Sequence, residues 1–184
     1  MTPIDPMHNL FLGTAKHMIS VWKTHGLLNE EKCRLIESRI HPFSCPSDTG
    51  KLPKMFATSM GSFNADQLKN WTLLFSVYAL HEILPEEHLE CWRKFVLACR
   101  RLCSRYISEG NAKVADIMMT DFCKKFENLY GSTLSHQICI FMVIYWTVFL
   151  ILVLYIHSGF LVLRDKMVFW GYTKQTKEMW KFRL

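Results

Sequence analysis

The chain has 184 residues, of which 50% are hydrophobic and 21% are charged, a composition that is typical of a folded protein and excludes an intrinsically disordered one. The net charge of +6 does not by itself indicate nucleic-acid binding, because most of the basic excess lies after residue 137 and phosphate binding needs positive charge clustered on one face. The seven cysteines are an odd number without the spacing of a secreted disulfide scaffold, and no signal-peptide pattern is present, so reduced intracellular thiols are expected.

The first part of the chain is expected to combine an extended segment with two helices. Residues 4–12 begin apolar and pass through Asp5, which precedes a proline, so a short strand or extended segment is predicted there. A helix ending at Gly26 is predicted next from the spacing of Leu10, Met18, Val21 and Trp22. A second helix is predicted over 29–40, with Asn29 as its N-cap and with three inward-facing residues, Leu35, Ile36 and Ile40.

A loop rich in proline, glycine and serine over 42–62 separates these elements from a third helix. Asn64 and Gln67 have the spacing of a capping box, in which each side chain bonds to the other residue's backbone amide. Apolar residues then follow at helical spacing before Pro85: Leu68, Trp71, Phe75 and Tyr78.

Two further amphipathic helices are predicted from the spacing of their apolar residues. The stretch 86–106 repeats them at steps of three and four, which draws one stripe: Leu89, Trp92, Val96, Cys99, Cys103 and Tyr106. The stretch 112–129 places another set inward: Ala115, Met118, Met119, Phe122, Phe126 and Leu129. Residues 64–130 are therefore expected to form a small helical bundle.

Three ordered blocks of the sequence resemble the catalytic domain of En/Spm (CACTA) type DNA transposases. The first reads IDPMHNLFLGTAKH and is similar to the segment around the family's second catalytic aspartate, where an Asp and two further residues precede His and Asn. The others read CPSDTGKLPKMF at 45–56 and FNADQLKNWTLLFSVYALHEILPEEHLECWRKFVLACRRLC at 63–103. Three blocks in the family's order are more specific than one motif.

The resemblance implies an RNase H-like fold, a nuclear location and metal-dependent cleavage and transfer of DNA strands. In such enzymes two Asp residues and a Glu hold two Mg²⁺ ions about 4 Å apart, which contact the attacking and leaving oxygens of the phosphodiester. Carried over to this sequence, the resemblance makes Asp5 a relict catalytic residue and metal ligand. It makes His8 a catalytic candidate, although a His at this position can also cap or pack against the following helix.

The sequence departs from the family pattern on both sides of the matching blocks. The family's first Asp has no counterpart, and after Gly131 an apolar tail stands where a His-rich segment with the final Glu is expected. We therefore expect a fragment that is truncated at both ends and inactive alone. The expected fold is mainly α: an incomplete RNase H-like fragment at 1–62, an α-helical insertion bundle at 63–131, and a tail at 132–184 with a long C-terminal apolar helix.

Five basic residues lie largely off the apolar stripe of the 86–106 helix and are candidates for contacts with a DNA backbone: Arg93, Lys94, Arg100, Arg101 and Arg105. Acidic residues share this helix at Glu86, Glu87 and Glu90, so a solvated face of mixed charge is the alternative. The same helix carries Cys99 and Cys103 one turn apart, a spacing that suits two zinc ligands, but no second pair follows at a finger-like distance. Core packing is the favoured interpretation of both cysteines.

The stretch 138–156 carries no formal charge, and it indicates a second possible function, membrane attachment. As a helix it reaches about 28 Å, close to the hydrocarbon thickness of a bilayer, so a transmembrane helix is predicted over 138–160. More Lys and Arg residues follow this span than closely precede it, which favours a cytosolic C-terminus. Three functions thus stay open: a transposase-derived fragment, a non-enzymatic single-pass membrane protein, and a domesticated DNA-binding module.

Overall fold

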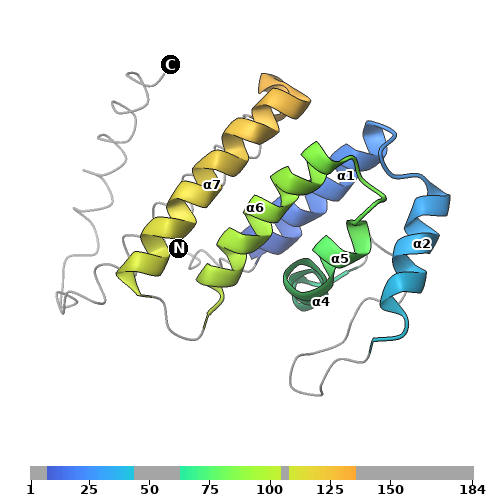
Figure 1. Cartoon of the computed structure of the whole chain (residues 1–184), viewed down its shortest axis with the longest axis horizontal. Helices are drawn as coiled ribbons and strands as arrows, with labels where there is room; N and C mark the ends of the chain where they lie inside the picture. Colours follow the sequence, from blue (N-terminus) through green and yellow to red (C-terminus); the bar gives the residue numbers. More distant parts are fainter. Residues whose placement is uncertain (1–7, 44–62, 105–107, 136–184) are drawn as a thin grey trace. The chain divides into compact units, whose positions relative to one another are not determined.

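The computed structural model describes residues 8–43, 63–104 and 108–135, and their regular structure is entirely helical (Figure 1). All of them belong to one compact unit, Met1–Ile151, whereas a second unit, Leu152–Leu184, lies outside the described residues. The prediction of a mainly α fold is confirmed for the described part. That part contains no strand, so it offers no counterpart to an RNase H-like sheet.

Two of the described helical segments have the wider π-helical winding. In order they are η1 (His8–Ala15, π-helical), α1 (Lys16–Thr24), α2 (Glu30–Ile40), α4 (Ala65–Asn70), η3 (Trp71–Phe75, π-helical), α5 (Ser76–Leu80), α6 (Glu86–Leu102) and α7 (Glu109–Tyr130).

The predicted strand over 4–12 is wrong for residues 8–12, which belong to η1. The buried residues of η1 and α1 explain the helix, because they recur with a helical period and not with the period of two that a strand needs: Phe11, Thr14, Ala15, Met18, Ile19 and Trp22. The helix ends as predicted near Gly26, whose φ of 68° suits a residue without a Cβ. The amides of Leu27 and Leu28 then donate to the carbonyl of Trp22 at 2.8 and 3.1 Å.

The second helix has the predicted position and N-cap. The Asn29 side chain accepts a hydrogen bond from the Lys32 amide at 2.9 Å, which satisfies one of the free donors at the start of α2. Ile36 and Ile40 are buried as predicted, but Leu35 is 46% exposed. The buried stripe runs through Cys33, Ile36 and Ile40 at steps of three and four, and Leu35 falls outside it.

The predicted helix after Asn64 begins with the capping box but is wound differently in its middle. Asn64 and Gln67 exchange backbone-to-side-chain hydrogen bonds of 2.8 and 3.0 Å. At η3 the Ser76 amide bonds to the carbonyl of Trp71, five residues back. This extra residue in the turn rotates the helix that follows. Its buried residues are therefore Ser76, Ala79 and Leu80. Tyr78 has helical spacing from Trp71, but it is 55% exposed.

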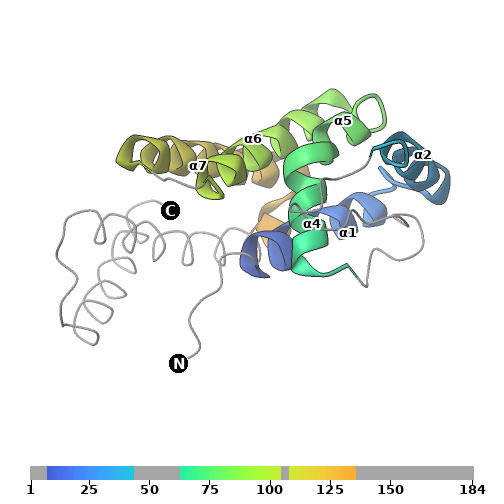
Figure 2. The same ribbon diagram turned by 90° about the horizontal axis from the view of Figure 1, so that it is seen from below.

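The longest helices, α6 and α7, pack along each other, and η1 and α1 complete one hydrophobic core with them (Figures 1 and 2). Aromatic rings pack between these helices. The ring centroids of Trp22 in α1 and Trp92 in α6 lie 5.2 Å apart, and those of Phe95 in α6 and Phe122 in α7 lie 5.3 Å apart. Burying each large apolar side chain contributes roughly 1.5–3 kcal/mol. The core is thus the main source of stability that the described helices share.

The predicted membrane-spanning segment 138–160 lies outside the described residues. Among the helices of the described ranges, none combines the length and the apolar character that crossing a bilayer requires.

Candidate functional site

The block that contains the candidate catalytic residues leads directly into η1. Asp5 lies outside the described residues, and His8 is the first residue of η1. The segment η1, which begins at His8, packs against α1 and α4. The catalytic roles of Asp5 and His8 and the metal-binding role of Asp5 stay predictions.

The basic residues of α6 separate into two flanks, and Arg105 lies outside the described residues. Arg93 and Arg100 are seven residues apart and therefore share one flank. Arg93 Nη1 lies 3.3 Å from Glu86 Oε1 on the same helix. Arg100 Nε donates a 2.7 Å hydrogen bond to the carbonyl oxygen of Leu73, inside the π-helical η3. Arg100 thus satisfies a backbone acceptor in the segment whose helical hydrogen bonding is altered.

The second flank faces α7. Lys94 Nζ lies 3.2 Å from Asp121 Oδ2, and Arg101 Nη1 lies 3.6 Å from the sulfur of Met118. Lys125 of α7 binds Glu90 of α6, and this hydrogen bond lowers the pKa of the Glu90 carboxyl. Four of the five DNA-binding candidates therefore contact other groups of the bundle.

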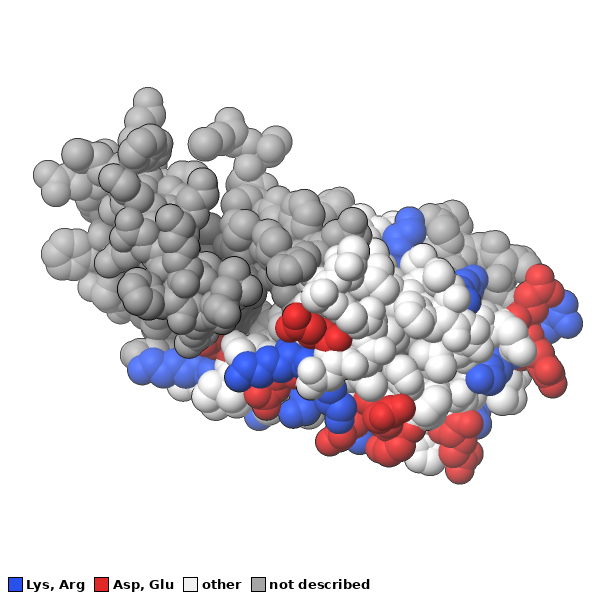
Figure 3. Space-filling model, turned by 90° about the horizontal axis from the view of Figure 1, so that it is seen from above, with Lys and Arg blue, Asp and Glu red and all other residues white. Residues whose placement is uncertain are grey.

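The charges along α6 are ordered by sign. Glu86 and Glu87 lie in its first turn, and Arg100 and Arg101 lie in its last turn, an arrangement that complements the helix dipole. In the space-filling view, acidic and basic side chains alternate along the lower edge of the described surface (Figure 3). On this face, the described residues form a surface of mixed charge and not a broad basic patch.

The two cysteines of the possible zinc pair differ in environment. Cys99 is fully buried in the core, whereas Cys103 follows α6 and is exposed. Burial raises the pKa of the Cys99 thiol, which disfavours the thiolate form that zinc binds. The core-packing interpretation is confirmed for Cys99 and is wrong for Cys103, which lies just beyond the last turn of α6.

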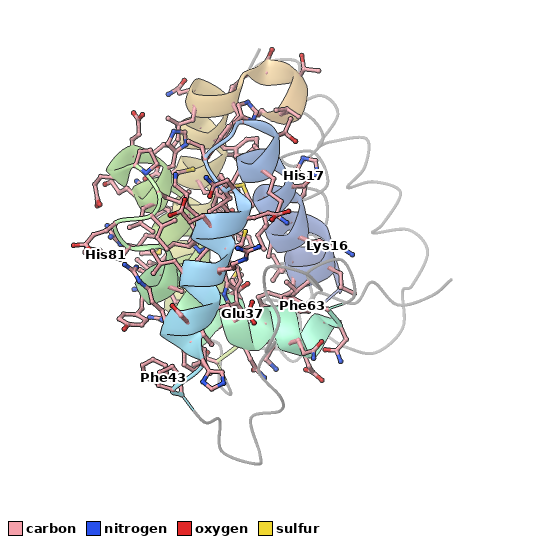
Figure 4. The ribbon with its side chains drawn as sticks, turned by 90° about the vertical axis from the view of Figure 1, so that its right-hand side faces the viewer. Lys16, His17, Glu37, Phe43, Phe63 and His81 are labelled. Carbon is pink, nitrogen blue, oxygen red and sulfur yellow. The ribbon has the colours of Figure 1, made fainter. Side chains whose placement is uncertain are left out.

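Lys16, His17 and His81 do not converge on one point. In Figure 4, Lys16 and His17 of α1 lie on one side of α2 and His81, which follows α5, lies on the other. Burial lowers the pKa of His17, and its Nε2 atom is buried without a hydrogen-bond partner. In the described ranges, no group of three or more His, Cys, Asp or Glu residues is placed to hold a metal ion. The ligand position that the resemblance implies for Mg²⁺, Asp5, lies outside the described residues.

A polar cluster around Tyr130 was not predicted from the sequence. The hydroxyl of Tyr130, the last residue of α7, lies 2.9 Å from Trp22 Nε1 and 2.7 Å from His88 Nδ1. It thereby joins α1, α6 and α7. The only signal in the sequence is that Tyr and Trp combine an apolar ring with a polar atom that seeks a partner when buried. That signal identifies no partner, because Trp22 and Tyr130 are 108 positions apart.

Comparisons with protein-family models, with curated proteins and with solved structures found no match for this chain.

Proposed function

We propose that this chain is a fragment derived from a CACTA-type DNA transposase. In this proposal, residues 63–131 correspond to the helical insertion of the catalytic domain, and Asp5 descends from one of its metal-binding aspartates. The observation that carries the proposal is the order of the three sequence blocks in the first 103 residues. The ancestral activity is metal-dependent cleavage and transfer of DNA strands in the nucleus.

The helices after Asn64 support this assignment. A helical insertion must fold into a stable unit while the catalytic residues lie elsewhere. Here α6 and α7 share a core through the Phe95–Phe122 contact and two ion pairs, Lys94–Asp121 and Lys125–Glu90. This part of the chain therefore suits a supporting role, with DNA as the partner of the complete catalytic unit.

Strand transfer by this sequence alone is not expected. The two-metal reaction needs several anionic ligands around both cations, and Asp5 is the one position here that matches the family's three. We therefore assign no catalytic step to the chain itself. Its residues contribute structure, and at Asp5 one inherited ligand position.

A chimera tests the proposal. Residues 1–131 of this chain replace the matching segment of an active CACTA-type transposase, and strand transfer is measured on DNA that carries that enzyme's terminal repeats. We expect the chimera to retain activity. The variant Asp5→Asn should lower it by about a hundredfold or more, because it removes an anionic metal ligand.

Asp66→Asn is the matched control, because Asp66 is an exposed carboxylate in the first turn of α4. It should leave strand transfer unchanged. A folded chimera with no activity, or equal effects of the two substitutions, would count against descent from this family.

Attachment to a membrane is the second candidate, and the uncharged stretch 138–156 favours it. In this alternative the bundle is a non-enzymatic domain of a single-pass protein. The full chain should then stay in the membrane fraction after carbonate extraction, whereas a chain that ends at residue 135 should be released. Release of both proteins would exclude this candidate.

A further inference from the structure

The hydroxyl group of Tyr130, at the C-terminal end of α7, forms hydrogen bonds with side chains of α1 and α6. Tyr130 is only 8% exposed, and its ring packs on Phe126 with the centroids 4.6 Å apart. The rings of His88 and His25 each lie with their centroids 5.3 Å from it. We call the hydrogen bonds from Trp22 to Tyr130 and from Tyr130 to His88 the Tyr130 chain.

The direction of the Tyr130 chain follows from the donors that are available. The Trp22 indole can only donate, so the Tyr130 oxygen accepts from it. We assign the single phenolic proton to the bond with His88 Nδ1, which lies 2.7 Å away. Burial raises the pKa of Tyr130, so this proton is retained. His88 must therefore be neutral, with its own proton on Nε2, which lies 3.7 Å from Glu87 Oε1.

Protonation of His88 conflicts with this arrangement. An imidazolium carries a proton on Nδ1, so both neighbours of the Tyr130 oxygen would be donors and the phenolic proton would lose its acceptor. A buried donor without a partner is costly. The charged and titratable groups facing His88 are Glu87 of its own helix, His25 at the end of α1, and Tyr130 of α7. Burial disfavours the imidazolium, Glu87 favours it and His25 opposes it, and together they lower the pKa of His88.

We propose that the Tyr130 chain is a proton-sensitive latch: when His88 takes up a proton at mildly acidic pH, the last turn of α7 is released from α1 and α6. The remainder of α7 stays in place, because Phe122 packs on Phe95 and Asp121 pairs with Lys94 nearer the middle of the helix. This inference does not depend on the proposed function.

Amide hydrogen exchange of the full chain tests the latch, with the protein kept in solution by a mild non-ionic detergent. Protection factors, corrected for the intrinsic pH dependence of exchange, are compared at pH 7.5 and 5.5 for the last turn of α7, residues 126–130. We expect them to fall by roughly fivefold to tenfold on acidification. Protection at the middle of α7, residues 115–122, should stay constant. An equal fall along the whole helix, or none at its end while the His88 ring titrates, would overturn the proposal.

Three variants test whether protonation of His88 causes the acid sensitivity of the last turn of α7. In His88→Gln the side-chain oxygen can still accept from Tyr130 but cannot be protonated, so protection should be high at both pH values. Tyr130→Phe should show low protection at both. His25→Gln keeps His88 and should respond to acid as the wild type does. The proposal fails if acid sensitivity persists in His88→Gln or in Tyr130→Phe, or if it disappears in His25→Gln.

Discussion

Trp22 and Tyr130 lie 108 positions apart in the sequence, yet the indole nitrogen of one donates a 2.9 Å hydrogen bond to the hydroxyl of the other. Trp22 is fully buried in α1, and its ring also meets Trp92 of α6 at an interplanar angle of 81°. The helices α1 and α7 are thus joined by a polar contact inside an aromatic core. Such a contact is specific, because a buried donor that loses its acceptor has no water to replace it.

Removal of the Tyr130 hydroxyl should destabilise the bundle. In Tyr130→Phe the Trp22 indole and His88 both lose their partner, so the free energy of unfolding should fall by about 1–3 kcal/mol. Urea denaturation at neutral pH measures the change. Tyr78→Phe is the control: Tyr78 is 55% exposed, and its substitution should alter stability by less than about 0.5 kcal/mol. Equal effects of the two substitutions would show that the Tyr130 hydroxyl contributes nothing specific.

Arg100 should contribute more to folding than to DNA binding. Its Nε satisfies the Leu73 carbonyl in η3, so Arg100→Met should lower the free energy of unfolding by about 1–2 kcal/mol. The comparison is Arg34→Met, which removes an exposed pair with Glu30 at 3.4 Å and should cost no more than about 0.5 kcal/mol. If Arg100→Met were as mild as Arg34→Met in thermal denaturation, the η3 contact would be unimportant for stability.

The contribution of the capping box at α4 to the stability of the fold should be measurable by itself. Asn64→Ala removes the acceptor of the Gln67 amide and should destabilise the bundle by about 1 kcal/mol. Asn128→Ala, at an exposed position inside α7, should be neutral or slightly stabilising, because alanine favours a helix interior. Chemical denaturation of both variants gives the difference, and a loss as large in Asn128→Ala would contradict the assigned role of Asn64.

Stability should decrease in mild acid because burial disfavours the protonated form of two histidines. Burial lowers the pKa of both His17 and His88, so below about pH 6.5 the unfolded chain binds more protons than the folded chain does. The contribution of these two histidines to the free energy of unfolding should be complete above that pH. It should decline as the pH falls below it. Urea denaturation between pH 7.5 and 5.5 measures this slope. The double variant His17→Gln, His88→Gln should flatten it, whereas the exposed His81→Gln should not.

DNA binding through the second flank of α6 should be weak, because its cations contact α7. Lys94→Gln combined with Arg101→Gln should change the affinity of the full chain for duplex DNA by less than about threefold, as measured by fluorescence anisotropy. The salt dependence of binding should also be unchanged. A slope that falls by about two would mean that both side chains contact phosphates, and the basic flank would then be a DNA-binding surface.

Local sequence signals predicted most of the helices correctly. Asn29 and Asn64 mark N-caps, Gly26 marks an end, and the steps of three and four along α6 describe its buried face. The extended segment at 8–12 and the inward orientation of Leu35 were wrong, because the packing of several helices decided which residues are buried. The winding at η3 could not be predicted, since nothing in the residues 71–75 requires one more residue in that turn.

The candidate site was much less predictable than the helices. The basic residues of α6 were identified as a group, but the sequence does not show that Arg100 contacts a carbonyl of η3 or that Lys94 contacts Asp121. Such contacts depend on tertiary packing. The Tyr130 chain was missed for the same reason, because its three members come from three helices.

The strand-transfer rate of the chimera that carries residues 1–131 tests the transposase-derived account most directly. The account predicts an active chimera in which Asp5→Asn lowers the rate by about a hundredfold or more and Asp66→Asn leaves it unchanged. A folded chimera whose activity is absent, or whose rate does not distinguish Asp5 from Asp66, would contradict it.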